Sequence, residues 1–218
     1  MRKEIFEEGQ FYHIYNRGVD KRNIFTDDKE RLRFIHALYV LNNFLTIPFR
    51  FDLFSLEPKQ PLTPISPYVE IVAGCLMPNH YHLMVTPKQK DGISKFFHKV
   101  GTSYSHYFNL RHERTGRLFE STFKAKHVDR HEYAVYLTQY IHLNPLGLCR
   151  AKLGTDADSE KILNWTARYQ WSTLPIYLGS TSPFSHLVST DFRNAILDMN
   201  TKEYRILLND LGQDLCRA

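Results

Sequence analysis

The chain has 218 residues, of which 43% are hydrophobic, so it can bury a core and is neither fibrous nor wholly disordered. It contains no apolar run of membrane-spanning length, and its N-terminal residues hold no apolar signal core, so we expect neither membrane insertion nor export. The three cysteines form no CxxC pair, which argues against disulfides and a cysteine zinc site and favours a reducing cytoplasm.

Positive charge is concentrated in one segment. The formal net charge of the chain is +5, and residues 88–130 alone contain ten basic and four acidic residues, a local excess of six. Such a segment suggests a polyanionic partner, most simply nucleic acid. A solvated surface that happens to be basic explains the charge equally well.

The first predicted elements are a strand and a helix. Alternating side chains predict a strand over residues 10–17. Apolar residues at helical spacing predict a helix from about Asp27 to Asn43, with Asp27 or Asp28 as its N-cap. Prolines recur through residues 44–67, so we expect an irregular insert there.

A hairpin, a helix and a short strand come next. The hairpin is predicted from strands at about Tyr68–Met77 and His80–Thr86, joined by a turn at Pro78 and Asn79. An amphipathic stripe predicts a helix over about Gly92–Leu110, most of it facing the core. A short strand is predicted near residues 123–128.

The last core helix is predicted to run to about Leu143. Asp129 as N-cap and Glu132 at N3 fit a capping box. Asn144 lies at the helix end, because Pro145 disfavours helical backbone in the residue before it. In the tail we expect a further helix over Asp191–Leu211 and four packing residues, namely Trp165, Trp171, Tyr177 and Leu178.

The first six core elements follow the order βαββαβ. This order predicts an α+β, ferredoxin-like or RRM-like fold, in which an antiparallel sheet carries two helices on one face. We expect a catalytic domain over residues 8–150, including the insert 44–67. Residues 151–218 are predicted to form a C-terminal helical extension packed on or beside the core.

A His-x-His pair in the predicted hairpin is the first candidate for chemistry. Residues i and i+2 of a strand face the same side, so His80 and His82 project together while Tyr81 projects oppositely. Imidazole is the commonest metal ligand, and two on one face make half a metal site. A pair of this kind in a strand more often has a structural role, so the hypothesis that it binds a metal ion depends on further residues.

The last core helix offers that support. Tyr133, Tyr136 and Tyr140 share one face, and Asn144 extends it by one turn. Two imidazoles and an amide oxygen suit a divalent ion that holds a scissile phosphate, and a tyrosine would then be the nucleophile. The alternatives are an ordinary core or surface aromatic for Tyr140 and a helix-terminal residue for Asn144.

Several segments together point to a family. They occur in order as residues 11–18 (FYHIYNRG), 77–82 (MPNHYH), 114–120 (RTGRLFE), 140–145 (YIHLNP), 170–173 (QWST) and 177–179 (YLG). This ordered set resembles the single-tyrosine HUH transposases of small insertion sequences, and most closely the REP-associated tyrosine transposases. The resemblance covers roughly residues 8–180, and neither the length of the insert nor the tail beyond about 180 has a counterpart in it.

The resemblance implies a role for each candidate. His80 and His82 match the metal-binding pair, Tyr140 the nucleophile and Asn144 the third ligand; the other two tyrosines of that helix face stay open as rivals. The family implies Mg²⁺ or Mn²⁺, single-stranded or hairpin DNA, a 5′-phosphotyrosine with a free 3′-hydroxyl, and a homodimer. We therefore expect a DNA-cleaving enzyme in the cytoplasm, associated with the nucleoid.

DNA contacts are expected from basic side chains and from aromatic rings that stack on unpaired bases. The candidate phosphate contacts are Arg17, Lys21, Arg22, Arg114, Arg117, Lys124 and Lys126. The remaining histidines, His13 among them, have no strong claim to function. Two other functions stay open: a domesticated protein that binds hairpin DNA without cleaving it, and a metal-dependent hydrolase that activates water.

Overall fold

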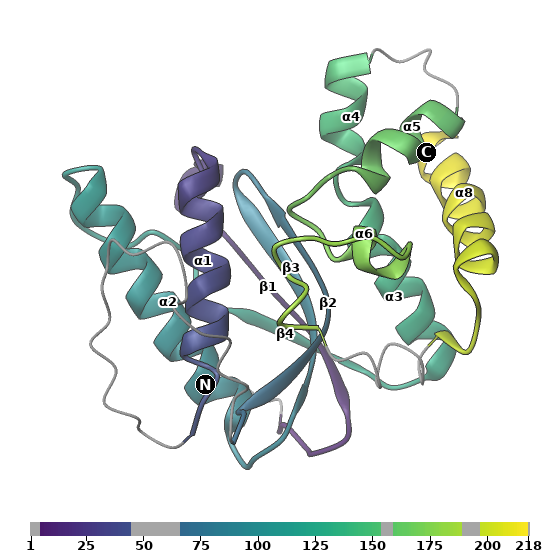
Figure 1. Ribbon diagram of the computed structural model, residues 1–218. Helices are drawn as coiled ribbons and strands as arrows, with labels where there is room; N and C mark the ends of the chain where they lie inside the picture. The colour runs from purple at the N-terminus through teal and green to yellow at the C-terminus, as the bar shows by residue number, and fades with distance from the viewer. Residues whose placement is uncertain (1–4, 45–65, 154–158, 189–196, 218) are drawn as a thin grey trace.

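The computed structural model describes residues 5–44, 66–153, 159–188 and 197–217 (Figure 1). The predicted insert falls almost wholly outside these residues, as does the start of the helix predicted over 191–211. Within the described parts, no helix combines the length and the apolarity needed to cross a bilayer.

A four-stranded sheet forms the centre of the molecule. Its strands are β1 (Phe11–Arg17), β2 (Val69–Met77), β3 (His80–Pro87) and β4 (Lys124–Val128), in the spatial order β2-β3-β1-β4. Every neighbouring pair is antiparallel. The predicted α+β fold is therefore confirmed.

The long helices divide between the two faces of the sheet (Figure 1). Helices α1 (Asp28–Val40) and α2 (Gly92–Arg111) pack together on one face, as predicted. Helix α3 (His131–Leu143) lies on the other face. The predicted N-cap of α1 is confirmed, because the Asp27 side chain accepts a hydrogen bond from the Glu30 amide.

Successive side chains of each strand point to opposite faces of the sheet. One face is packed against α1 and α2, and the other is covered only in part by α3. On the α1 side, the Tyr81 ring packs 5.0 Å from the Phe34 ring. On the α3 side, the Thr138 hydroxyl of the helix donates to the sulfur of Met84 at 3.6 Å. Because His80 and His82 are even-numbered like Met84, they face α3.

The start of α3 differs from the prediction. Arg130, not Asp129, is the N-cap; its backbone is still extended at φ −139° and ψ 149°, and no side chain caps the helix. Glu132 consequently stands at N2 instead of N3. The expected capping box is absent because the chain leaves β4 in an extended form for one residue longer than the pattern suggested.

The tail also differs from the prediction. The helix expected over 191–211 is broken: residues 198–200 are not helical, and Asp198 has a φ of 41°. Helix α8 begins instead at Thr201 and runs to Arg217. Asn200 caps it by accepting from the Glu203 amide, and the Glu203 carboxylate accepts from the Asn200 amide in return. This Asn-x-x-Glu capping box marks the helix start, and the sequence reading overlooked it.

The extension contains further helices, and α8 packs against α3 and α5. Its other helices are α4 (Leu146–Leu153), α5 (Ser159–Ala167) and the short α6 (Leu174–Tyr177). Of the predicted packing residues, Trp171 and Tyr177 are buried, and Trp165 and Leu178 pack against the core while partly exposed. The domain division predicted at residue 150, which lies inside α4, stays a prediction.

One buried histidine ties α3 to this extension. His142 is fully buried, with Nδ1 2.6 Å from the Tyr204 hydroxyl of α8 and Nε2 2.7 Å from Thr173 Oγ1. Burial lowers the pKa of His142 to about 3, so the imidazole is neutral at pH 7. A neutral imidazole has one donor and one acceptor nitrogen, and here both have partners.

We predict that Tyr204→Phe lowers the free energy of unfolding by about 1–3 kcal/mol, because a buried imidazole nitrogen of His142 loses its partner. Urea unfolding followed by circular dichroism measures this change. The matched control is Tyr136→Phe at an exposed position, where we expect a change within about 0.5 kcal/mol. Equal stability of the two variants would contradict the anchoring role of Tyr204.

Candidate active site

The His-x-His pair lies at the start of β3, where the β2–β3 turn meets the end of β1. In the β1–β3 register, His80 pairs with Arg17 and His82 pairs with Tyr15. The turn itself is held by the Gly18 amide, which donates to the Asn79 carbonyl at 2.9 Å. The two imidazoles therefore stand beside β1, on the face that α3 covers.

Asn79 fixes the orientation of the His80 ring. The Asn79 side-chain amide donates to the Lys21 carbonyl at 3.2 Å, so its oxygen faces His80 Nδ1, 2.6 Å away. An amide oxygen only accepts, and Nδ1 must therefore carry the proton. His80 Nε2 then presents its lone pair toward Asn144 Oδ1, at 3.0 Å.

In the contact between His80 and Asn144, two electron-pair donors face each other with no hydrogen between them. An unprotonated imidazole nitrogen and an amide oxygen are both electron-pair donors, so a shared cation would stabilise them. Asn144 reaches this place because it is the C-cap of α3, still in helical conformation at φ −51° and ψ −35°. The structure thus brings together two residues that are 64 positions apart.

His82 is oriented by His13, a residue for which the sequence analysis predicts no role. Its Nδ1 lies 2.8 Å from His13 Nε2, and both side chains are buried, with 8% of each residue exposed. With Nδ1 engaged, Nε2 is the nitrogen left to bind a ligand. His13 faces the site because it alternates with Tyr12 and Ile14 along β1. Its contact with His82 depends on the pairing register of β1 and β3, which one strand alone does not reveal.

Burial keeps these histidines neutral. Burial, together with the neighbouring His13, His80 and Arg17, lowers the pKa of His82 to about 2. Burial, followed by the charge of Lys126, lowers the pKa of His13 to about 4. The pKa of His80 is also lowered, chiefly by burial. A neutral imidazole is the form that can bind a metal ion, and His80 and His82 are in that form at pH 7.

Tyr140 is the tyrosine of α3 that lies beside the histidines. It is half-buried, with its ring 5.7 Å from the His82 ring and 6.5 Å from the His13 ring. The rival tyrosines lie elsewhere: Tyr133 and Tyr136 stack on each other at 6.4 Å. Among the described residues, Tyr140 is therefore the tyrosine of this helix in contact with the His-x-His pair.

The donor set fits a divalent cation with open coordination positions. It consists of one nitrogen each from His80 and His82 and the amide oxygen of Asn144. Over the described residues, no group of three or more His, Cys, Asp or Glu side chains could hold a metal. A cation held by these three groups would have mixed nitrogen and oxygen ligands, which suit a borderline to hard ion.

Three of the predicted DNA contacts surround this site. Arg17 is exposed at the end of β1, and its charge contributes to the lowered pKa of both His80 and His82. Lys124 and Lys126 are exposed on β4, where they pair with Tyr15 and His13 of β1. All of them alternate onto the face that carries the histidines.

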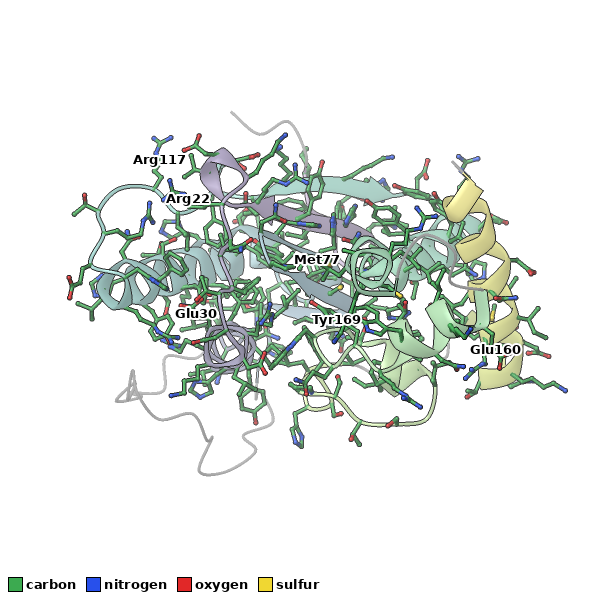
Figure 2. The ribbon with its side chains drawn as sticks, turned by 90° about the horizontal axis from the view of Figure 1, so that it is seen from above. Arg22, Glu30, Met77, Arg117, Glu160 and Tyr169 are labelled. Atoms are coloured by element: carbon green, nitrogen blue, oxygen red, sulfur yellow. The ribbon has the colours of Figure 1, made fainter. Side chains whose placement is uncertain are left out.

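The other predicted contacts lie in two adjacent loops at one end of the sheet. Figure 2 shows Arg22 and Arg117 near one another, and the Val19 amide donates to the Leu118 carbonyl between their loops. A Cβ on Gly18 would lie 2.4 Å from the Arg22 carbonyl, so only glycine permits this close return of the chain. Lys21 is exposed in the first of these loops.

Arg114 is already engaged within the fold. Its guanidinium donates to Asn109 Oδ1 at 2.5 Å and to the Arg117 carbonyl at 3.2 Å. The same Asn109 side chain donates to the Gly116 carbonyl, so these bonds close the turn after α2. Arg114 therefore supports the loop that presents Arg117.

Comparison with known proteins places this geometry in context. Residues 66–144 match the family described as Transposase IS200 like, and the matched segment runs from β2 to the C-cap of α3. This part of the chain therefore resembles the core of an IS200-like transposase. This segment contains the His-x-His pair, Tyr140 and Asn144, and the resemblance predicted from the sequence is confirmed.

Structural comparison agrees on the fold. A solved structure described as the REP-associated tyrosine transposase bound to a REP hairpin resembles this chain with a TM-score of 0.50 and 15% sequence identity. The likeness covers 82% of this chain and 84% of that chain. No curated protein matches the chain. The family match and the shared fold support a transposase-like function on DNA.

We predict that the metal-free protein loses stability as the pH falls below about 6.5. The folded pKa values of His13, His82 and His142 are about 4, 2 and 3, so below pH 6.5 the unfolded chain binds more protons than the folded one. The stability that these histidines contribute is complete at pH values above the pKa of the unfolded chain. It is lost progressively as the pH falls from there toward the pKa values of the folded state. The slope should approach about 4 kcal/mol per pH unit for three histidines.

Urea unfolding measured in steps from neutral pH to about pH 5 tests this prediction. The matched control is His98→Gln, which removes an exposed histidine and should leave the slope unchanged. A free energy of unfolding that stays flat across the range would contradict the neutral, buried state of these histidines.

Proposed function

We propose that this protein nicks and rejoins single-stranded DNA through a phosphotyrosine formed on Tyr140. The observation that carries the proposal is the double contact made by α3. Tyr140 lies beside His82, and Asn144, one turn later, lies against His80. One helix thus presents a nucleophile and an oxygen ligand to the same pair of imidazoles.

His80, His82 and Asn144 would hold the divalent ion, Mg²⁺ or Mn²⁺. When bound, such an ion supplies Lewis-acid polarisation of the scissile phosphate. The chain contributes preorganisation: Asn79 orients His80, and His13 orients His82. Arg17, exposed next to His80, adds positive charge where the phosphate would approach.

Tyr140 performs the covalent step. Its Oη bonds to phosphorus while the bond from phosphorus to the 3′ oxygen breaks. The phenol proton is released and the departing 3′ oxygen takes up a proton, which leaves a 5′-phosphotyrosine and a free 3′-hydroxyl. Because one ester replaces another, the bond energy is conserved and attack by a 3′-hydroxyl reverses the step.

The DNA partner follows from the charge and from the structural likeness. The similar solved structure holds a REP hairpin. We infer that this chain also binds single-stranded DNA next to a hairpin. The contacts would come from the exposed cations near the site and from the two loops at the end of the sheet that carry Arg22 and Arg117. We further propose a homodimer that works at the nucleoid in the cytoplasm.

We predict that Tyr140→Phe abolishes formation of a covalent protein–DNA adduct, because phenylalanine lacks the attacking oxygen. The assay incubates protein with Mn²⁺ and single-stranded oligonucleotides from the regions flanking its own gene, followed by a denaturing gel. Tyr133→Phe and Tyr136→Phe are the matched controls and should retain the adduct.

The same gel separates the alternative functions. Cleavage that persists in Tyr140→Phe without any adduct would indicate a metal-dependent hydrolase that activates water. Tight hairpin binding with no cleavage in the unmodified protein would indicate a domesticated binding protein. An adduct that is lost in Tyr133→Phe or in Tyr136→Phe would assign the nucleophile to that tyrosine instead.

We predict that His13→Phe weakens Mn²⁺ binding by about 10–100-fold, because His82 loses the partner that sets its orientation. Electron paramagnetic resonance of free Mn²⁺ during a titration measures the affinity without requiring catalysis. The control is His98→Phe at an exposed position of α2. Unchanged affinity in a folded His13→Phe variant would show that His13 does not position the site.

A further inference from the structure

We propose that Tyr15 is a stacking platform for an unpaired base next to the scissile phosphate. This inference rests on the proposed function and adds a binding residue to it. Tyr15 pairs with His82 of β3 on one side and with Lys124 of β4 on the other. A row across three strands thus places an aromatic ring between a candidate metal ligand and an exposed cation.

The fold supports one side of the Tyr15 ring and leaves part of it open. The centre of the Tyr15 ring lies 4.8 Å from the centre of the His13 ring. It lies 5.7 Å from the centre of the His82 ring, and the planes of Tyr15 and His82 differ by 26°. Tyr15 is nevertheless only half-buried. Within the described residues its hydroxyl makes no hydrogen bond, so the fold does not require this phenol.

The charges around Tyr15 match a nucleic acid strand. The Lys124 ammonium lies 6.0 Å from the centre of the Tyr15 ring, and Lys126 is the next residue of β4 on the same face. Glu120 pairs with Lys124 at 3.6 Å, but both side chains are substantially exposed, so a phosphate can compete for the ammonium. Aromatic rings flanked by cations are the usual platform for single strands.

The position of Tyr15 specifies which nucleotide it would contact. Tyr15 and Tyr140 both have rings 5.7 Å from the His82 ring. A strand whose phosphate reaches Tyr140 therefore has its neighbouring base within reach of Tyr15. Duplex DNA would not use this platform, because its bases are already stacked on both faces.

Photocrosslinking in the Tyr140→Phe background tests the platform without requiring cleavage. The probe is a fluorescein-labelled oligothymidylate of about 20 nucleotides that carries 5-iododeoxyuridine, which crosslinks to stacked aromatic side chains. We expect the crosslink at Tyr15, in the tryptic peptide of residues 4–17. Tyr15→Leu should weaken binding about tenfold, whereas Tyr15→Phe should bind within about twofold of the parent.

Two controls separate stacking from general effects. Phe44→Leu makes the same aromatic-to-leucine change at an exposed site near α1 and should leave affinity unchanged. Lys124→Ala should reduce the slope of log affinity against log salt by about 0.7, the value for one phosphate contact on a single strand. Lys202→Ala, on α8, should leave that slope unchanged.

The outcomes distinguish this inference from the proposed function. If Tyr140 forms the adduct but Tyr15→Leu binds normally and Tyr15 does not crosslink, nicking stands and the platform is overturned. If binding and crosslinking depend on Tyr15 while no adduct forms, the platform stands and nicking fails. If the oligothymidylate does not bind at all, the platform is overturned, and nicking is judged separately by the adduct formed with gene-flanking oligonucleotides.

Discussion

The pairing register of β1 against β3 is the constraint on which the site depends. It sets Arg17 opposite His80 and Tyr15 opposite His82, and it brings His13 within hydrogen-bonding distance of His82. A slip of β1 by one residue would turn Arg17, Tyr15 and His13 to the packed face, where α1 and α2 bury the alternate residues. The hydrophobic core on that face therefore fixes the geometry of the polar face.

The second requirement is a fixed position for α3. Its helical periodicity sends Tyr140 and Asn144 toward the histidine pair and His142 toward the C-terminal extension. The buried bonds of His142 with Tyr204 and Thr173 hold that helix from outside the sheet. Among its described residues, the extension contributes no candidate ligand or nucleophile, but its contacts with α3 help to fix the helix that carries Tyr140 and Asn144.

Local spacing was enough to predict some features, and pairing between distant segments decided the rest. The i, i+2 spacing of His80 and His82 and the one-turn separation of Tyr140 from Asn144 predicted shared faces, which the structure has. His13 escaped notice because its role arises from strand register, which no single segment encodes. The capping box predicted at Asp129 was wrong because the backbone stays extended through Arg130, so that the helix begins one residue later than the local pattern indicates.

Mass spectrometry of the protein–DNA product tests the central claim most directly. After cleavage in Mn²⁺, nuclease and trypsin treatment should leave residual nucleotide on the peptide of residues 131–150, which contains all three tyrosines of α3. The account predicts that fragmentation places the phosphodiester on Tyr140. A phosphodiester on Tyr133 or Tyr136, or nicked DNA with no modified peptide, would contradict it.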